Sequence, residues 1–380
     1  MTGEKITRPD PPNGKNAVFV GIWFTNSCNL NCSYCYIKQK SDLTISADQA
    51  METLGAELSK EGALMDILFM GAETLTHFTQ MKQLIERISR QKWKRKYHFT
   101  ITTNGTLLTE EMKGWFREHR DTVTMGLSYD GDEEAQNRNR SGCASRIDRG
   151  FFRETWPHQR WKMTISADTA ADTDKNVIAL HELGVPFSAN AAYEETAWPE
   201  EKILQFELAL YRLADYYIDN PDIRPCSLLS LLEDVLDAPE ETKQERYCGA
   251  GESLCFFDME GTPYPCHMLS PLVMPREKAM EGMYFAADAD FEDPRCKSCP
   301  VKHTCYTCLG TNYLYRGDVR LRDPLHCRLY QAEIRATAHM WIGKLKGKER
   351  YTATEKKMIK TVRKLTDAFR KGTIGMREDG

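Results

Sequence analysis

The alternation of short apolar runs with longer amphipathic segments constrains the fold of this chain more than any other feature. Between residues 17 and 217, six apolar runs of strand length alternate with six segments of helical spacing. The expected strands are 17–25, 63–70, 97–103, 122–128, 162–167 and 186–192, and the expected helices are 45–60, 78–93, 109–120, 146–154, 173–183 and 199–217. This order favours parallel strands joined by right-handed crossovers, closed or partly closed as a barrel. Eight units make a full TIM barrel, so six units predict an α/β fold with a partial (β/α)6 barrel.

A cysteine loop follows the first expected strand. Cys28, Cys32 and Cys35 are separated by three and then two residues, so one short loop can turn three thiolates towards a common point. A structural zinc ion takes four protein ligands and a cubane iron–sulfur cluster has four iron corners, so three sulfurs leave one position open for a substrate or cofactor. The spacing alone also allows structural cysteines or a zinc knuckle that is completed from elsewhere.

With Tyr34 directly before Cys35, this loop resembles the CxxxCxΦC motif of the radical S-adenosylmethionine (radical SAM) superfamily. The resemblance implies that Cys28, Cys32 and Cys35 hold a 4Fe-4S cluster, and that Tyr34 lies near the adenine of SAM. The methionyl amine and carboxylate of SAM would chelate the fourth iron. Reduction of the cluster would then cleave SAM and release a 5'-deoxyadenosyl radical that abstracts a hydrogen atom. The family also implies a partial (β/α)6 barrel, in agreement with the strand pattern.

The end of the second expected strand resembles another motif of this family. Residues 71–74 read GAET, where the family has Gly-Gly-Glu-Pro, and the resemblance implies that Glu73 and the local backbone receive the methionyl ammonium. Gly71 keeps the backbone freedom of the motif and Glu73 keeps its acceptor, whereas the second Gly is replaced by Ala72 and the Pro by Thr74.

Two later strand ends resemble further motifs of the same family. Asn104 belongs to a TNG segment, and Ser128 and Asp130 belong to an SxDG segment that would offer a hydroxyl and a carboxylate to the SAM ribose. Arg140 resembles the arginine that often follows, and it would face the SAM carboxylate. Each segment alone is typical of an ordinary turn. Their order behind successive expected strands favours a SAM-binding site.

The second half of the chain carries most of the cysteines. Thirteen cysteines are many for a chain whose thiols we expect to stay reduced, so metal binding is the favoured use, and only Cys143 and Cys226 are interpreted as free thiols. The other eight outside the first loop are Cys248, Cys255, Cys266, Cys296, Cys299, Cys305, Cys308 and Cys327. Eight suffice for two cubane clusters. The CxxCx5CxxC run at 296–308 could instead bind one zinc ion, although its central gap is shorter than in an ordinary zinc ribbon.

This cysteine field resembles the SPASM extension of radical SAM enzymes. The resemblance implies two auxiliary 4Fe-4S clusters, one held by Cys248, Cys255, Cys266 and Cys308 and the other by Cys296, Cys299, Cys305 and Cys327. The chain would then bind three 4Fe-4S clusters and SAM. Two residues precede Cys308 where the usual pattern has three, which makes Cys308 the departure. The expected organisation is a flexible N-terminus (1–16), the barrel (17–222), a helical linker (223–246) that includes a helix at 225–236, a SPASM domain (247–328) and C-terminal helices (329–380).

The resemblance also suggests a class of reaction. SPASM enzymes mostly act on peptides, so the leading hypothesis is a maturase that forms a C–S or C–C cross-link, or a related oxidation, in a ribosomally made precursor peptide. It would take electrons from a flavodoxin- or ferredoxin-type donor. The alternative is an anaerobic sulfatase-maturating enzyme that forms formylglycine, in which the general-base Asp is here replaced by His267, a candidate proton acceptor. A third hypothesis is a non-catalytic iron–sulfur electron-transfer protein.

Composition and charge argue against nucleic acid and membrane as partners of this chain. The net charge of -4 gives no basic footprint for nucleic acid, and the lysine- and arginine-rich stretches at 92–96 and 344–350 are interpreted as solvated helix ends or a local docking patch. No run of about eighteen apolar residues is present, and residues 1–15 lack the apolar centre of a signal peptide. We therefore expect a cytoplasmic protein with no membrane segment.

Overall fold

The computed structural model describes residues 18–192, 198–230, 248–282, 291–302 and 304–376. Four parallel strands form the first wall of the fold: β1 (Val18–Thr25), β2 (Met65–Gly71), β3 (Tyr97–Thr103) and β4 (Val123–Leu127). Two further parallel strands, β5 (Trp161–Ile165) and β6 (Phe187–Ala191), form a second sheet. A parallel bridge between Ser128 and Lys162 links the two sheets. The predicted α/β fold with a partial barrel is confirmed. Between β4 and β5, the regular pairing of neighbouring strands is replaced by this isolated bridge.

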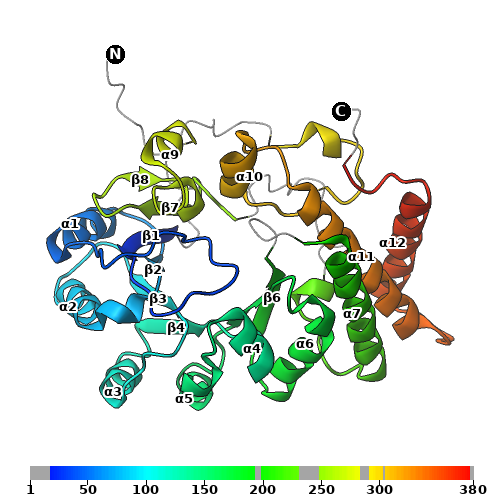
Figure 1. Cartoon of the computed structure of the whole chain (residues 1–380), viewed down its shortest axis with the longest axis horizontal. Helices are drawn as coiled ribbons and strands as arrows, with labels where there is room; N and C mark the ends of the chain where they lie inside the picture. The colour runs from blue at the N-terminus through cyan, green and yellow to red at the C-terminus, as the bar shows by residue number, and fades with distance from the viewer. Residues whose placement is uncertain (1–17, 193–197, 231–247, 283–290, 303, 377–380) are drawn as a thin grey trace.

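Helices surround the strands (Figure 1). The six expected helices are α1 (Ala47–Leu58), α2 (Phe78–Ser89), α3 (Glu110–Glu118), α5 (Arg149–Thr155), α6 (Thr173–Glu182) and α7 (Glu200–Asp219). Ser46 caps α1 by accepting a hydrogen bond from the backbone N–H of Gln49. A short helix that the sequence analysis missed, α4 (Glu133–Asn139), follows the fourth strand and is capped by Asp132. Short 3-10 turns are η1 (Thr74–His77), η2 (Ala144–Arg146) and η3 (Ala170–Asp172).

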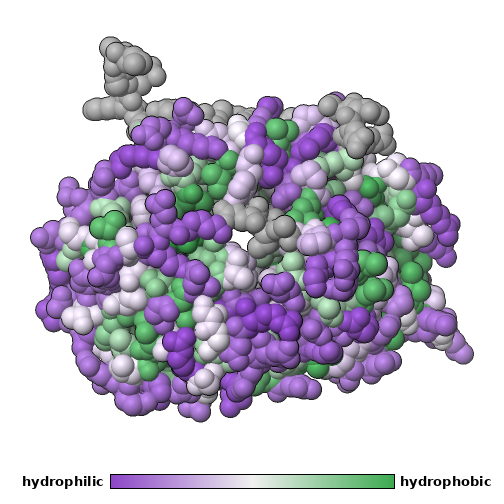
Figure 2. Space-filling model, in the orientation of Figure 1, coloured by the Kyte–Doolittle hydropathy of each residue, from purple (hydrophilic) through white to green (hydrophobic). Residues whose placement is uncertain are grey.

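The two faces of the barrel strands differ in chemistry. Val20, Ile22 and Phe24 of β1 are buried with the outer helices in one large core. Along β3, Phe99 and Ile101 share this core, whereas Thr100 and Thr102 alternate with them and are partly exposed. Since successive side chains of a strand point to opposite faces, Thr100 and Thr102 lie on the inner face of the barrel, which is partly open to solvent at β3. Figure 2 shows this view of the molecule hollowed near its centre.

The cysteine-rich segment joins the barrel sheet instead of following it as a detached unit. Strand β7 (Leu254–Phe257) pairs in parallel with β1, and β8 (Pro263–Tyr264) pairs antiparallel with β7, so the sheet order is β4-β3-β2-β1-β7-β8. The 3-10 turns η5 (His267–Leu269) and η6 (Pro294–Cys296) and the helices α9 (Arg276–Gly282) and α10 (Leu309–Arg316) follow. The division of the chain at residues 246 and 328 therefore stays a prediction.

Two long helices end the described chain. Helix α11 (Pro324–Leu345) packs along α7, where Arg335 donates two hydrogen bonds to Glu207, at 2.6 and 2.7 Å. Helix α12 (Ala353–Arg370) begins with a capping box formed by Thr352 and Glu355. Both helices were predicted. Of the expected helix at 225–236, the structure has the 3-10 turn η4 (Ser227–Leu229), and residues 231–236 lie outside the described part.

Candidate functional site

The cysteine loop is fastened to the carboxyl end of β2. The backbone N–H of Ala72 donates to the carbonyl of Thr25 at 3.0 Å, and the N–H of Glu73 donates to the carbonyl of Ser27 at 2.8 Å. Gly71 makes this approach possible: its φ is +126°, and a Cβ there would lie 2.0 Å from the Thr25 carbonyl oxygen. The glycine of the GAET segment is therefore required by the geometry of the strand end.

The three thiols of this loop lie near one another. Burial raises the pKa of Cys28, and burial likewise raises the pKa of Cys32 to about 11, with the Arg140 guanidinium opposing and the Cys35 and Cys28 thiolates adding to the increase. Because charges affect one another's pKa only at short range, the effect of Cys35 and Cys28 on Cys32 indicates that the three sulfurs lie close together. Burial of Cys28 and Cys32 makes this region one of low polarity. A cationic iron cluster would remove this penalty, because metal-bound cysteine is held as the thiolate.

Glu73 is buried and already has hydrogen-bond partners. Its carboxylate accepts from the Thr103 hydroxyl at 2.8 Å and from the backbone N–H groups of Asn104 and Leu75 at 2.7 and 3.1 Å. It therefore joins the ends of β2 and β3. The amide of Asn104 in turn donates to the Asn29 side chain inside the cysteine loop at 3.0 Å. The predicted contact of Glu73 with the methionyl ammonium stays a prediction beside this structural role.

Asp130 and Arg140 form a buried ion pair at the end of β4. Arg140 donates from Nε and Nη2 to the Asp130 carboxylate at 2.9 and 3.0 Å. The Asp130 carboxylate also accepts from Tyr34 Oη at 2.7 Å, from Asn139 Nδ2 at 3.1 Å and from the Thr164 backbone at 2.9 Å. Burial alone would lower the pKa of Arg140, but the charge and hydrogen bonds of Asp130, together with the Tyr34 and Cys32 side chains, outweigh it and raise the pKa.

This arrangement points Arg140 and Tyr34 towards the same space. The Arg140 guanidinium lies 5.3 Å from the centre of the Tyr34 ring, a cation–π distance. Within the described ranges, Nη1 of Arg140 makes no hydrogen bond, so it can receive a carboxylate. The sequence analysis missed Asn139, which the unrecognised helix α4 carries. The Ser128 hydroxyl makes no hydrogen bond to another described side chain, and its ribose contact, like that of Asp130, stays a prediction.

A second group of cysteines surrounds the turn η5. Burial raises the pKa of Cys266, and the thiolates of Cys308 and Cys248 raise it further, which places these three sulfurs in one neighbourhood. Gly310 permits the packing of α10 against this turn, because a Cβ there would lie 2.4 Å from the Met268 Cβ. Cys255 is buried on β7.

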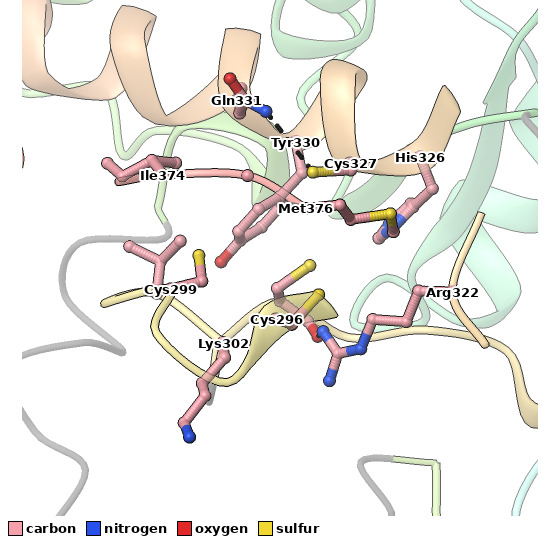
Figure 3. A pocket seen from close by; sticks show the side chains of 13 residues that line it. Cys296, Cys299, Lys302, Arg322, His326, Cys327, Tyr330, Gln331, Ile374 and Met376 are labelled. Carbon is pink, nitrogen blue, oxygen red and sulfur yellow. Dashed lines mark hydrogen bonds between the residues drawn. The ribbon is translucent and has the colours of Figure 1, made fainter. Parts of the chain in front are cut away.

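A third group of cysteines lines one cavity (Figure 3). Cys296, Cys299, Cys305 and Cys327 face it together with Arg322, Tyr330 and Met376, among other residues. Burial raises the pKa of Cys305 to about 12, with Arg322 opposing and the Cys327 and Cys296 thiolates adding to the increase. Cys308 lies with the second group instead, so the third group takes its fourth sulfur from Cys327. This arrangement departs from the zinc alternative of 296–308.

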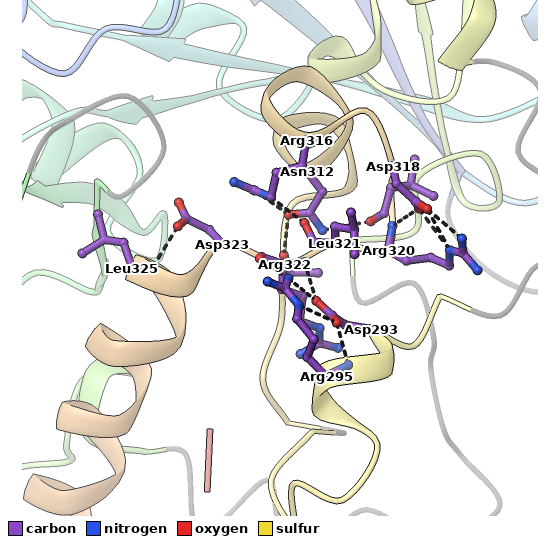
Figure 4. Close-up of polar contacts among 12 residues, drawn as sticks. Asp293, Arg295, Asn312, Arg316, Asp318, Arg320, Leu321, Arg322, Asp323 and Leu325 are labelled. Atoms are coloured by element: carbon purple, nitrogen blue, oxygen red, sulfur yellow. Dashed lines mark hydrogen bonds and ion pairs between the residues drawn. The ribbon is translucent and has the colours of Figure 1, made fainter. Parts of the chain in front are cut away.

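A buried carboxylate holds the segments of the third group together (Figure 4). Asp293 accepts from the Arg295 side chain at 2.6 and 3.0 Å and from the Arg322 backbone at 2.8 Å. Arg322 in turn donates to the Cys305 carbonyl at 2.6 Å. Burial would raise the pKa of Asp293, but the hydrogen bonds from Arg295 and Arg322 bring it below its ordinary value. The sequence analysis missed Asp293, although Asp-Pro at a turn start is a recognisable capping pattern.

The described sulfurs of the three groups are not arranged to chelate a single metal ion. Within the described part of the chain, no three His, Cys, Asp or Glu side chains come close enough to chelate a single metal ion. The donors gathered in each group are thiols, which are the usual ligands of iron–sulfur clusters. The residues therefore fit cluster ligands, while the number of clusters stays a prediction.

His267 lies between the second cysteine group and the inside of the barrel. Its ring contacts Tyr36 at 5.8 Å and Phe256 at 6.2 Å between centroids. Its buried Nδ1 has no hydrogen-bond partner among the described residues. Burial lowers the pKa of His267 to about 4, and the Lys162 ammonium lowers it further in the same direction. The position suits a residue that meets a substrate, and its proton-accepting role stays a prediction.

Comparison with known proteins identifies the class. The family model of the radical SAM superfamily matches residues 22–190, so this part of the chain is a radical SAM domain. It carries the cysteine loop, Glu73, Asp130 and Arg140, and a domain of this family implies a 4Fe-4S cluster and SAM.

Individual relatives are similar over different lengths. The chain is 30% identical over 128 residues to a cysteine-type anaerobic sulfatase-maturating enzyme of Clostridium perfringens, covering 31% of this chain and about a third (34%) of that protein. It is 20% identical over 357 residues to the radical SAM cyclopropyl synthase TigE of Paramaledivibacter caminithermalis, covering 85% of this chain and 74% of that protein.

Solved structures share the fold. Native anSMEcpe with bound AdoMet and Cp18Cys peptide superposes with a TM-score of 0.63 at 18% identity, covering 92% of this chain and 100% of that one. Streptococcus suis SuiB bound to precursor peptide SuiA superposes with a TM-score of 0.52 at 17% identity, covering 81% of this chain and 75% of that one.

Among the described helices of the present chain, none has both the length and the hydropathy needed to cross a bilayer.

Proposed function

We propose that this chain is a radical SAM enzyme that modifies a side chain of a ribosomally made precursor peptide, through a C–S or C–C cross-link or a related oxidation. The observation that carries the proposal is the gathering of cysteines into three separate groups, one of them beside Arg140 and Glu73. The fold likeness to SuiB bound to its precursor peptide, and to anSMEcpe with a bound peptide, supports a peptide substrate.

The residues at the carboxyl end of the barrel strands would have different roles in binding the cluster and SAM. Cys28, Cys32 and Cys35 would hold the cluster that binds SAM. When bound, the cluster and SAM would supply a one-electron reductive cleavage, and modification of the substrate would then begin with hydrogen abstraction. Arg140, fixed by Asp130, would orient the SAM carboxylate. Two cubane clusters at the other cysteine groups complete the proposed set of three.

Iron content and SAM cleavage test this proposal together. After anaerobic reconstitution with iron and sulfide, we expect about twelve irons per wild-type chain and about eight in a Cys28→Ala, Cys32→Ala, Cys35→Ala variant. 5'-Deoxyadenosine should form only with the wild type under a strong reductant. Full iron without SAM cleavage would contradict the enzyme hypothesis and favour an electron-transfer protein. About four irons with bound zinc would contradict the two auxiliary clusters.

An anaerobic sulfatase-maturating enzyme is the second candidate. The sequence similarity to the Clostridium perfringens enzyme and the fold similarity to peptide-bound anSMEcpe favour it. His267 stands where that family has its catalytic Asp, which favours the peptide maturase. Mass spectrometry separates the two: formylglycine from a sulfatase-derived Cys or Ser peptide supports the second candidate, and a cross-linked precursor peptide supports the first.

The electron donor belongs to the same proposal. We propose a flavodoxin- or ferredoxin-type protein, because reductive cleavage needs single electrons from a soluble carrier. Residues 344–371 hold eleven Lys and Arg against three Asp and Glu, a basic stretch in a chain with a net charge of -4. Acidic carriers would be attracted to it.

A further inference from the structure

Lys162 extends from β5 across the inner face of the barrel. Its neighbours along the strand, Trp161 and Met163, are both 2% exposed and pack on the outer side. Strand alternation therefore turns Lys162 inward. Its ammonium donates to the Thr102 hydroxyl of β3 at 3.1 Å, spanning the intervening strand β4. The side chain is open to solvent yet surrounded by protein, as expected for a residue that lines a lumen.

This cation has no anionic partner in the described part of the chain. Burial alone lowers the pKa of Lys162, with no carboxylate acting against it. Two lysines on the outer helices differ: Lys113 pairs with Asp148 and Glu110 at 2.7 Å, and Lys175 pairs with Asp172 at 2.7 Å. A partly desolvated cation without a counter-ion is costly unless a ligand provides one.

Two buried polar groups without hydrogen-bond partners among the described residues lie in the same region. His267, whose Nδ1 lacks a hydrogen bond, lies within electrostatic range of Lys162. Trp23 follows the inner face of β1 and packs in one cluster with Tyr36 and Phe256, the two rings that His267 contacts. The buried Nε1 of Trp23 also has no partner among the described residues. Native proteins leave few buried polar groups without partners, so these groups together indicate a ligand site.

We propose that Lys162 binds a carboxylate of the peptide substrate, with the Trp23 and His267 side chains lining the same site. The inference rests on the proposed peptide substrate and adds a recognition rule: the residue to be modified lies near an acidic side chain or near the C-terminal carboxylate of the peptide. The SAM carboxylate has its own cation in Arg140, which the Asp130 pair holds at the end of β4. Lys162 lies on a different strand and is left for the substrate.

Binding of four synthetic peptides to the SAM-loaded, reconstituted protein tests this inference without turnover. The peptides are fluorescein-labelled Gly-Cys-Ala-X-Ala-Gly, with X either Asp or Asn, each as the C-terminal acid and as the C-terminal amide. Fluorescence anisotropy gives their dissociation constants. We expect a carboxylate to tighten binding to the wild type by about tenfold, in line with a hydrogen-bonded charge pair. The matched peptides show whether the side chain or the C-terminus provides it.

Variants assign the preference to one side chain. Lys162→Met should abolish it, and Lys162→Arg should retain it. Lys175→Met, an exposed lysine of α6 outside the barrel lumen, is the control and should retain it. Iron content equal to that of wild type shows that Lys162→Met is folded.

Four outcomes would overturn the inference. Equal binding of all four peptides to the wild type leaves the proposed function standing but removes the role of Lys162. An unchanged preference in Lys162→Met does the same, and a loss of SAM affinity with the preference intact assigns Lys162 to the SAM site. If no peptide binds the wild type at all, the peptide substrate class fails as well.

Discussion

At the scale of single residues, Gly71 decides whether the cysteine loop can meet the end of β2. Its φ of +126° and the 2.0 Å approach to the Thr25 carbonyl exclude any side chain. We expect Gly71→Ala to lower the thermal unfolding midpoint by several degrees, corresponding to about 1–3 kcal/mol of backbone strain, and to weaken SAM binding. Gly114→Ala is the matched control, because a Cβ at this position of α3 meets nothing within 4 Å. It should be neutral or stabilising.

Calorimetry and equilibrium dialysis with SAM check this prediction. A Gly71→Ala protein that unfolds at the wild-type temperature and binds SAM normally would contradict it. The strand end would then have to rearrange without cost.

Glu333 gives a pH dependence that does not involve the cysteine groups. It is 5% exposed on α11, and burial raises its pKa from 4.5 to about 8. The unfolded chain ionises this carboxyl near its ordinary value while the folded chain keeps it protonated, so stability falls as the pH rises from about 4.5 to 8. We expect Glu333→Gln to unfold at a higher temperature than wild type at pH 8, with little difference at pH 5. Thermal unfolding across this pH range measures it.

Glu349→Gln, an exposed change between α11 and α12, is the control for Glu333→Gln and should follow the wild-type pH profile. Parallel pH profiles for wild type and Glu333→Gln would show that the Glu333 carboxyl ionises normally in the folded protein.

At the scale of elements, Asp293 connects η6 to the segment that leads into α11, and so connects Cys296 to Cys327. We expect Asp293→Asn to lose the third cysteine group as a cluster site, so that iron falls from about twelve to about eight per chain. Asp318→Asn is the matched control, since Asp318 pairs with Arg320 in a neighbouring turn where both side chains are partly exposed. Iron analysis with Mössbauer spectroscopy distinguishes the variants. Full iron in Asp293→Asn would mean that the cysteines alone organise the site.

The elements also show how far sequence reasoning reaches. Strand β3 occupies its predicted range, and the other barrel strands lie within a few residues of theirs, because periodicity is a local property. Helix α4 was missed because seven residues are too short for a clear apolar period. Strand β7 was missed because its four residues are stabilised by pairing with β1, more than two hundred residues earlier in the chain. Such long-range pairing leaves no local signal.

The candidate site, like the fold, could be predicted from the sequence only in part. Motifs identified Glu73, which lies at the end of β2, and Asp130 and Arg140, which pair at the end of β4. Their hydrogen bonds to Thr103, Asn104 and Asn139 were not foreseen, because they depend on how neighbouring strand ends meet. The sequence analysis interpreted Lys162 as part of an apolar strand. The direction of its side chain depends on which face of β5 is turned into the barrel, which the sequence alone does not show.

At the scale of the whole molecule, charge is distributed unevenly. The basic stretch 344–371 includes Lys356, Lys360 and Lys364, which are exposed and spaced to lie along one face of α12. The buried side of the same helix packs in one cluster with Cys296 and Cys299, and Met376 beyond its end lines their cavity. A carrier docked on α12 would therefore stand next to the third cysteine group.

We expect an acidic flavodoxin to reduce this protein more slowly as salt rises from about 50 to 500 mM, because screening weakens steering between opposite charges. Reversal of Lys356, Lys360 and Lys364 to Glu should slow reduction by about tenfold or more at low salt. Reversal of Lys92, Lys94 and Lys96 to Glu changes the net charge equally at another exposed site and should have a much smaller effect. Stopped-flow bleaching of the cluster absorbance measures the rates, with dithionite as a reductant that needs no docking. Equal slowing by both triple variants would indicate net charge alone, whereas slowing confined to α12 places electron entry beside the cavity of Cys296, Cys299, Cys305 and Cys327.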